Sequence, residues 1–331
     1  MSWKTIMFAV PSPIDIGLIE ADKVAGIAAV LDAQLQLFHC VFDASVAHPG
    51  KLAPASAEEP IHQLVLNAQH GLERIAERLR ARGLQVDTSV RWDDPAHEGI
   101  VRQVLRHKPS LLIARSHHQE RAAGLPAHTD WKLIETCPCP LLLLKSPSPY
   151  AKPLVIAAVD PTHAHDKPAE LDGHLLDSAA LLTAALSGSL EVFHARIPWE
   201  EAIHLDPELR DLPEYRDEEI HRTYLAQMEA QVLKLTERHN IARAKVKIED
   251  GRAAELLPRF ANGRNADIVA MGAVSRSRLR HALLGDTAER TLDALRCDVL
   301  IVKPPGFRSP VRRQSTHHVV AGPELRTRLR W

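Results

Sequence analysis

The second half of this 331-residue chain repeats the order of predicted elements found in the first half, and this repeat limits the fold most strongly. Each half contains five short apolar runs typical of strands, separated by stretches with the periodicity of helices. A constant shift of 158 positions, without a gap, places Ala114 on Gly272, Thr129 on Thr287 and Cys139 on Cys297. We therefore predict one domain duplicated in tandem.

The alternation of strands and helices predicts the fold class. Strands that alternate with helices at this spacing form a mostly parallel sheet covered on both faces. We predict an α/β protein with two tandem open, mostly parallel five-stranded sheets, each with helices on both faces in a Rossmann-like arrangement. The predicted strands are 5–10, 35–41, 85–91, 110–114 and 141–144, and then 154–159, 190–195, 244–248, 268–271 and 299–302.

A proline-rich stretch marks the boundary between the two halves. Residues 146–153 read SPSPYAKP, a composition that disfavours both helix and sheet. The predicted organisation is a first domain over 1–146, a linker over 147–153, a second domain over 154–305 and a basic, flexible tail over 306–331.

The composition limits the partners and the cellular location that we expect for this protein. The formal net charge is −1, so no field of the whole protein favours nucleic acid or an acidic membrane, and such a partner would need a local patch. Four cysteines make no disulfide framework, which is typical of a reducing compartment. No apolar run reaches the length of a membrane span or a signal peptide. We predict a cytoplasmic protein without a membrane partner.

The main candidate for a binding site is the loop that follows the predicted strand at 268–271. The apolar run stops at Gly272, an arginine-rich stretch follows, and a helical pattern begins near Asp286. A strand, loop and helix start of this kind directs backbone N–H groups and the positive end of a helix dipole toward one point. This is how α/β proteins hold phosphate groups.

Several segments resemble the universal stress protein family, in particular its tandem, two-domain UspE-like branch. In the second half these are MGAVSR at 271–276, LGDTAE at 284–289 and LRCDVLIVKP at 295–304. In the first half they are TDWKL at 129–133 and CPCP at 137–140. The resemblance extends over nearly the whole chain up to Pro305 and implies the fold predicted above.

The resemblance implies an ATP site in the second domain only. Members that bind nucleotides have an aspartate after the first strand, two spaced glycines, and a third glycine followed by serine or threonine. Asp160, Gly272 and Gly285 match this pattern, whereas Ser275 replaces the second glycine and Asp286 replaces the hydroxyl residue. A carboxylate at a helix N-cap satisfies the free N–H groups itself and repels a phosphate. The candidate site residues are Asp160, Gly272, Ser275, Arg276, Gly285, Asp286 and Thr287, and Arg276, Arg278, Arg280 and His281 could hold an anion.

The first half departs further from the pattern. Pro11 takes the place of the aspartate, and Ala114, His117 and Ala127 take the glycine places, so we predict a degenerate domain without a nucleotide. The histidines at 117–118 and 163–165 have no spaced partner that would indicate a metal site. The cysteines at 137 and 139 lead into an apolar strand, which favours a structural role over a redox pair.

The sequence carries no nucleophile elbow, Walker loop or spaced pair of carboxylates, so we predict a protein that is not an enzyme. The resemblance implies a role in stress tolerance, which we expect to act through the binding of a ligand or a partner. One alternative is an ATP-binding switch or slow ATPase that uses Asp160, Gly272, Gly285 and Thr287. Another is a carrier of a non-nucleotide small molecule in the second-domain crevice, for instance an apolar one with an anionic head.

Partners follow from the sheet edges and from the tail. The apolar strands at 141–145 and 299–303 would lie at sheet edges, which must be paired or covered. The resemblance implies that they pair across the two domains or between chains, and a homodimer and an unknown regulatory protein are the expected partners. The tail is basic, and as an alternative to a solubilising role it would serve as an arm for nucleic acid or an anionic surface. Its charged residues are Arg308, Arg312, Arg313, Arg326, Arg328 and Arg330, with Glu324 as the one acid.

Overall fold

The computed structural model describes residues 2–13, 18–43, 46, 58–116, 128–161, 170–196, 218–273 and 291–315. The chain divides into two compact units. Unit 1 comprises Met1–Ala151 and the C-terminal segment that begins at Gly306, and unit 2 comprises Lys152–Pro305. The division between Ala151 and Lys152 therefore falls within the proline-rich stretch that the sequence predicts as a linker.

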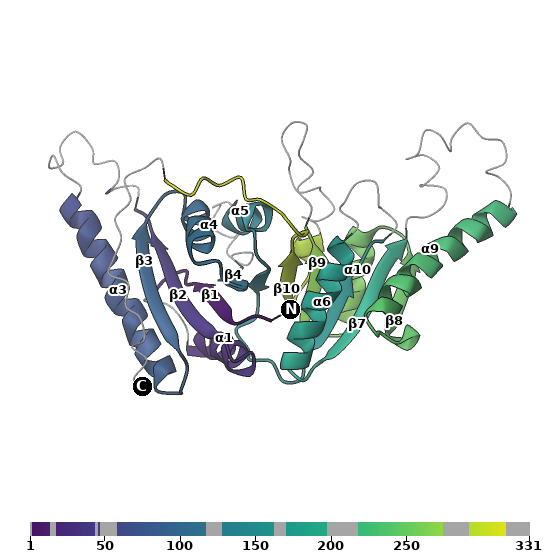
Figure 1. Ribbon diagram of the computed structural model, residues 1–331, viewed down its shortest axis with the longest axis horizontal. Helices are drawn as coiled ribbons and strands as arrows, with labels where there is room; N and C mark the ends of the chain where they lie inside the picture. Colours follow the sequence, from purple (N-terminus) through teal and green to yellow (C-terminus); the bar gives the residue numbers. More distant parts are fainter. Residues whose placement is uncertain are drawn as a thin grey trace. The chain divides into compact units, whose positions relative to one another are not determined.

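Unit 1 is a five-stranded parallel sheet with helices between its strands (Figure 1). Its strand order is β3-β2-β1-β4-β5, so the order reverses beside β1. The elements are β1 (Thr5–Ala9), α1 (Leu18–Val30), β2 (Gln34–Val41), α3 (Glu58–Arg80), β3 (Val86–Trp92), α4 (Ala96–His107), β4 (Leu111–Arg115), α5 (His128–Thr136) and β5 (Leu141–Leu144).

Unit 2 repeats this arrangement, with the strand order β8-β7-β6-β9-β10 and all described pairs parallel. Its elements are β6 (Leu154–Ala158), α6 (Leu171–Ala185), β7 (Ser189–Arg196), α9 (Glu218–Arg238), the 3-10 turn η3 (Arg243–Lys245), β8 (Val246–Asp250), α10 (Ala253–Gly263), β9 (Ile268–Gly272) and β10 (Asp298–Val302). The predicted fold class is confirmed. The predicted start of the third strand at 244 is wrong, because residues 243–245 form the 3-10 turn.

Two neighbouring residues of β3 show why each sheet carries helices on both faces. Successive side chains of a strand point to opposite faces. Thr88 accepts a hydrogen bond from Gln69 of α3 at 2.8 Å, and Ser89 accepts one from Gln103 of α4 at 3.2 Å. Helices α3 and α4 therefore cover opposite faces, and strands buried on both sides read as continuous apolar runs.

Strand register corrects the alignment of the two halves by one position. Ala9 of β1 pairs with Ala114, whereas the equivalent residue of β6, Ala158, pairs with Met271. Arg115, not Ala114, therefore lies at the level of Gly272. Paired residues of β9 and β10, such as Val269 and Val299, are 30 positions apart, whereas those of β4 and β5, such as Leu112 and Leu141, are 29 apart. An alignment without a gap is therefore wrong at this strand.

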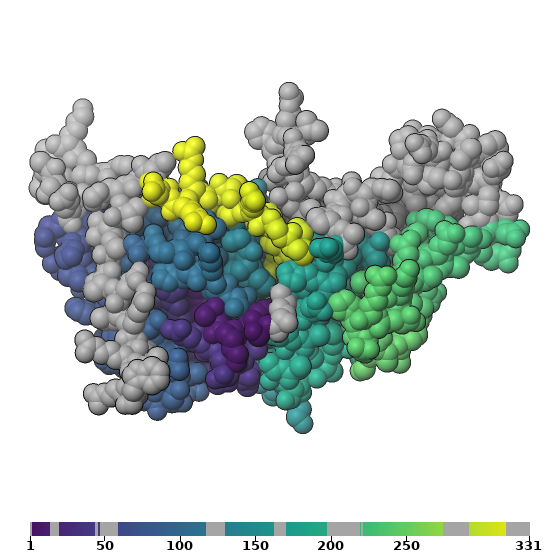
Figure 2. All heavy atoms as spheres, in the orientation of Figure 1, coloured from purple at the N-terminus to yellow at the C-terminus, as the bar shows by residue number. Residues whose placement is uncertain are grey.

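The C-terminal segment lies on unit 1 as far as residue 315. The Ser315 hydroxyl donates to Asp93 Oδ1 at 2.9 Å, and Arg102 Nε donates to the carbonyl of Arg312 at 3.3 Å. Figure 2 shows this segment in yellow over the blue surface of unit 1. Residues 306–315, which the sequence assigns to a flexible tail, thus make specific contacts, and the prediction for 316–331 lies outside the described residues.

Within the described parts of the chain, no helix combines the length and the apolar character needed to cross a membrane. The cytoplasmic location stays a prediction.

Candidate functional site

The candidate site of unit 2 lies where the strand order reverses. Strand β6 pairs with β7 on one side and with β9 on the other, and ligands of open α/β sheets bind at the carboxyl ends of such strands. Asp160 follows β6 and Gly272 ends β9, so the structure brings these two predicted residues to the same end of the sheet. The other predicted residues, Ser275, Arg276, Gly285, Asp286 and Thr287, lie outside the described residues.

The backbone of Asp160 is held by the helix that follows it. Its N–H donates to Asp172 Oδ1 at 3.2 Å, and Asp172 is the acidic residue in the first turn of α6. The Asp160 side chain is 41% exposed, and its Oδ1 lies 4.0 Å from Nδ1 of His194. A half-exposed carboxylate at this position can accept hydrogen bonds from a ligand hydroxyl or amino group.

His194 is a site residue that the sequence analysis missed. It lies on β7, is only 1% exposed, and its Nδ1 is 3.0 Å from the carbonyl oxygen of Val159. Unit 1 has the same arrangement, with Nδ1 of His39 2.7 Å from the carbonyl of Val10. Each histidine is the sixth residue of its strand, so the internal repeat was the signal that could have found the pair. In both units the ring fixes the backbone that leads out of the first strand.

A charged pair, Arg196 of β7 and Asp250 of β8, lies at the same end of the sheet. Arg196 Nε lies 2.5 Å from Asp250 Oδ1, and a second nitrogen of Arg196 is 3.0 Å from Oδ2. The hydrogen bond between the two side chains lowers the pKa of Asp250 and raises the pKa of Arg196. Burial raises the pKa of Tyr224 on α9; the positive charge of Arg196 opposes this shift and the negative charge of Asp160 adds to it. The carboxyl end of the sheet thus combines acid, imidazole, guanidinium and phenol groups.

Gly272 has a packing role of its own. A Cβ atom at this position would lie 2.8 Å from Cδ2 of Leu171, the first residue of α6. That approach is closer than a real Cβ contact, so a side chain here would displace the buried Leu171 side chain at the start of α6. Contact with a phosphate is therefore not needed to explain this glycine.

The same end of unit 1 is built differently. Pro11 stands in place of Asp160, and Arg115, at the level of Gly272, has its Nε 3.4 Å from Glu20 Oε1 of α1. Further along the edge, the rings of Phe42 and Trp92 lie 5.5 Å apart. At the level where unit 2 has Gly272, which carries no side chain, unit 1 therefore has Arg115 and its partner Glu20. His117 and Ala127 lie outside the described residues.

The described cysteines and histidines form no metal centre. No group of three or more histidine, cysteine or acidic side chains in the described ranges could hold a metal ion. The thiols of Cys137 and Cys139 lie 3.6 Å apart at the entry to β5. The hydrogen bond with Cys137, together with burial, raises the pKa of Cys139, so the thiolate is disfavoured. The histidines at 117–118 and 163–165 lie outside the described residues.

The model of the universal stress protein family matches residues 3–145 and 162–303, one copy in each unit. The chain belongs to the universal stress protein family. Universal stress protein E of Escherichia coli (strain K12) is 30% identical over 237 residues, which cover 69% of this chain and 72% of that protein. Universal stress protein E of Photorhabdus laumondii is 24% identical over 281 residues, which cover 84% of this chain and 88% of that protein.

Solved structures agree with the tandem arrangement of this universal stress protein. A putative universal stress protein from Pseudomonas aeruginosa UCBPP-PA14 has a TM-score of 0.62 and 26% identity, with 91% of this chain and 94% of that chain covered. A functionally unknown protein from Pseudomonas aeruginosa PAO1 has a TM-score of 0.66 and 24% identity, with 91% of this chain and 93% of that chain covered. The predicted resemblance to the tandem, UspE-like branch is confirmed.

Proposed function

We propose that this tandem universal stress protein acts by binding and without turnover, and that its ligand site lies in unit 2 at the carboxyl ends of β6 and β9. The observation that carries the proposal is the difference between the units at this end. Unit 2 places the half-exposed Asp160 beside Gly272, whereas unit 1 has Pro11 and the Arg115–Glu20 pair at these levels. Unit 2 thus has a half-exposed acid after its first strand and no arginine side chain at the level of Gly272.

A nucleotide is the first candidate ligand. The carboxylate of Asp160 would accept hydrogen bonds from the base or the ribose, and the loop after β9 would hold the phosphates. ATP is therefore the probe, and isothermal titration calorimetry of the full chain is the test. Asp160→Ala should weaken ATP binding by about tenfold or more, the effect of losing a charged hydrogen-bond acceptor. Asp286→Ser, in the part of the loop that is not described, should tighten binding.

The matched control for this titration is Pro11→Ala, which changes the equivalent position of unit 1. It should leave ATP affinity unchanged. If neither Asp160→Ala nor Asp286→Ser alters the affinity, the nucleotide hypothesis is rejected.

A non-nucleotide ligand is the second candidate, because packing against Leu171 accounts for Gly272 and Asp286 disfavours a phosphate at the helix start. The protein would then carry another small molecule in the same crevice of unit 2. Mass spectrometry of the gently purified chain under native conditions, followed by identification of the released compound, separates the two candidates.

The geometry around His194 supports a role without turnover. Asp160 and His194 lie 4.0 Å apart at the site, but the imidazole is buried and its Nδ1 is held by the Val159 carbonyl. A general base must reach the proton that it takes from a substrate. We expect no phosphate release above the uncatalysed rate when the protein is incubated with ATP. Release that Asp160→Ala abolishes would contradict this expectation and favour a slow ATPase.

The partner predictions stay open to experiment. We propose a homodimer, a regulatory protein partner, and contact with nucleic acid only through the basic C-terminal segment. Light scattering coupled to size-exclusion chromatography measures the oligomeric state, and a dependence of nucleic-acid binding on salt and on the residues after Pro305 tests the basic segment.

A further inference from the structure

The C-terminal segment 306–315, which lies on unit 1, ends in a serine preceded by two arginines. Residues 312–315 read RRQS, so Arg312 and Arg313 stand three and two positions before Ser315. Both arginine side chains are exposed, and within the described part of the chain neither makes an ion pair or a side-chain hydrogen bond. The described residues 306–315 contain no helix or strand, so an enzyme could bind this stretch as an extended peptide.

Two exposed guanidinium groups at these positions suit an enzyme with acidic pockets. A guanidinium group forms bidentate, charge-assisted hydrogen bonds with carboxylates. Serine kinases that select basic substrates hold arginines at the second and third positions before the acceptor hydroxyl in this way. Ser309, the other serine of the segment, has an arginine only at the adjacent position, Arg308. The spacing therefore distinguishes Ser315 from Ser309 as an acceptor.

The Ser315 hydroxyl also takes part in docking the segment on unit 1. It donates to Asp93 Oδ1 at 2.9 Å. The Asp93 carboxylate is 3% exposed, and it also accepts hydrogen bonds from the Asp94 N–H at 2.9 Å and from Arg102 at 2.7 Å. The buried carboxylate is thus surrounded by donors. A negatively charged group in place of the hydroxyl would face it directly.

We propose that Ser315 is phosphorylated by a serine kinase that selects basic substrates, and that the phosphate prevents the segment from docking on unit 1. In the transfer, Ser315 Oγ forms a bond to the γ-phosphorus of ATP while the bond from that phosphorus to the bridging oxygen of ADP breaks. The hydroxyl proton passes to a base of the kinase, and ADP leaves. The phosphate brings about two negative charges at pH 7 and lacks the hydrogen that Ser315 donates. Asp93 would repel it.

Docking and phosphorylation exclude each other, because the docked hydroxyl is bound to the buried Asp93. The kinase would act on the detached segment, and the phosphate would then hold the population in the detached state. This regulation goes beyond the ligand site proposed for unit 2. Ser315 belongs to unit 1, so either proposal can fail without the other.

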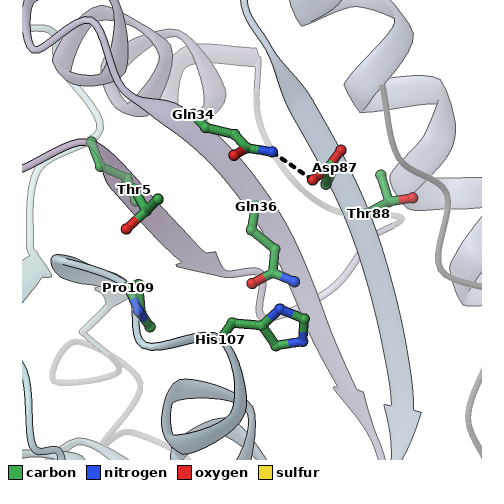
Figure 3. Close-up of a pocket in the computed structure, with 8 residues that line it drawn as sticks. Thr5, Gln34, Gln36, Asp87, Thr88, His107 and Pro109 are labelled. Carbon is green, nitrogen blue, oxygen red and sulfur yellow. Dashed lines mark hydrogen bonds between the residues drawn. The ribbon is translucent and has the colours of Figure 1, made fainter. Parts of the chain in front are cut away.

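The opposite end of the same sheet provides a reference region for the test. A pocket of about 230 Å³ is formed there by the starts of β1, β2 and β3 and by the end of α4. Figure 3 shows Gln34 of β2 extended toward Asp87 of β3, to which it donates a hydrogen bond at 2.7 Å. Asp93 follows the other end of β3. Local release of the segment should therefore leave the strands at this pocket unchanged.

The first experiment incubates the full chain with ATP and the catalytic subunit of cyclic-AMP-dependent protein kinase, a probe with this specificity. Fragmentation mass spectrometry locates the phosphate, which we expect on Ser315. Arg312→Gln combined with Arg313→Gln should slow the reaction by about tenfold or more, because the charge-assisted hydrogen bonds to the kinase are lost. Ser309→Ala is the matched control and should react at the wild-type rate. Phosphate mainly on another residue, no phosphate, or equal rates for the wild type and the arginine variant would overturn the proposal.

The second experiment measures docking by hydrogen exchange. After phosphorylation the amides of residues 306–315 should exchange about tenfold or more faster, whereas those of the strands at the pocket should not change. Ser315→Glu and Ser315→Gln give a comparison that does not need the kinase. Their side chains are nearly equal in size, but only Ser315→Glu places a negative charge beside Asp93, so the segment should exchange faster in that variant. Equal exchange of the two variants, or equally faster exchange at the pocket, would contradict a local release of the segment.

Discussion

Ser315 donates a hydrogen bond to Asp93 at 2.9 Å, although the two residues are 222 positions apart in the chain. Asp93 also accepts a hydrogen bond from Arg102 at 2.7 Å, and these two side chains are only 3% and 7% exposed. The C-terminal segment therefore covers a buried ion pair of unit 1. A basic extension that composition alone describes as a tail is, up to residue 315, part of the packing of the first unit.

The hydrogen bond of Ser315 should contribute to the stability of unit 1. Ser315→Ala should lower the free energy of unfolding by about 1–2 kcal/mol, because a charged, buried acceptor loses one donor. Urea denaturation followed by tryptophan fluorescence measures the change. Gln314→Ala, at the exposed neighbouring position, is the control and should have no effect. Equal stability of the two variants would show that the segment does not hold unit 1.

Removal of the Asp93 carboxylate should lower the free energy of unfolding more than removal of Glu98, the other carboxylate partner of Arg102. Asp93→Ala leaves the Arg102 guanidinium buried with Glu98 as its remaining carboxylate partner, and loss of one member of a buried pair costs about 3–5 kcal/mol. Glu98→Ala removes the more exposed carboxylate, 35% exposed, and should cost less than about 1 kcal/mol. The same denaturation measurement ranks the two variants, and the reverse order would contradict the assignment of Asp93 as the buried partner.

Cys40 should resist alkylation in the folded protein. Burial raises the pKa of its thiol to about 12, the charge of Asp93 adds to the shift, and the thiolate is the reactive form. At pH 8 we expect iodoacetamide to leave Cys40 unmodified in the native chain and to modify it fully in urea, as measured by peptide mass spectrometry. Modification of native Cys40 at the rate of the unfolded chain would show that the site is open.

The Arg196–Asp250 pair should make a small contribution to stability that depends on pH. The pKa of Asp250 in the folded state lies below its usual value of 3.8, so the contribution is present above about pH 4 and is lost as the pH falls through the folded value. Because the Asp250 side chain is 58% exposed, the contribution should be less than about 1 kcal/mol.

A double-mutant cycle with Asp250→Asn and Arg196→Met, measured by urea denaturation at pH 7 and pH 3, isolates this contribution. The coupling energy should be positive at pH 7 and smaller at pH 3, where protonation of Asp250 begins to remove the ion pair. A coupling energy that is equal at the two pH values would argue against an ionic interaction.

The strands were predictable because they are buried on both faces. Leu111 to Arg115 and Asp298 to Val302 read as apolar runs, and their ends agree with the structure within two residues. The start of β8 was misplaced because the alternation of apolar and polar residues in this strand extends back to Ala244. The backbone of residues 243–245 nevertheless forms a 3-10 turn. Periodicity shows where a strand is buried, but it does not show where the local backbone leaves the extended conformation.

The site was predictable only in part. The sequence places Asp160 and Gly272 at one edge of the sheet because they follow apolar runs that end there, and their part in ligand binding stays a prediction. The position of Arg115 was hidden by a difference of one residue in strand register between the two halves, which an alignment without a gap cannot show. His194 was missed because a histidine within a strand has no local pattern, and only comparison with His39 in the repeat distinguishes it.

The most direct test of the central claim is a comparison by native mass spectrometry of the wild type with Asp160→Ala and Pro11→Ala. The wild type and Pro11→Ala should each retain one small molecule per chain after gentle purification, whereas Asp160→Ala should show the mass of the chain alone. A wild-type chain without a bound molecule, or an Asp160→Ala variant that retains the same molecule, would contradict a ligand site at Asp160 in unit 2.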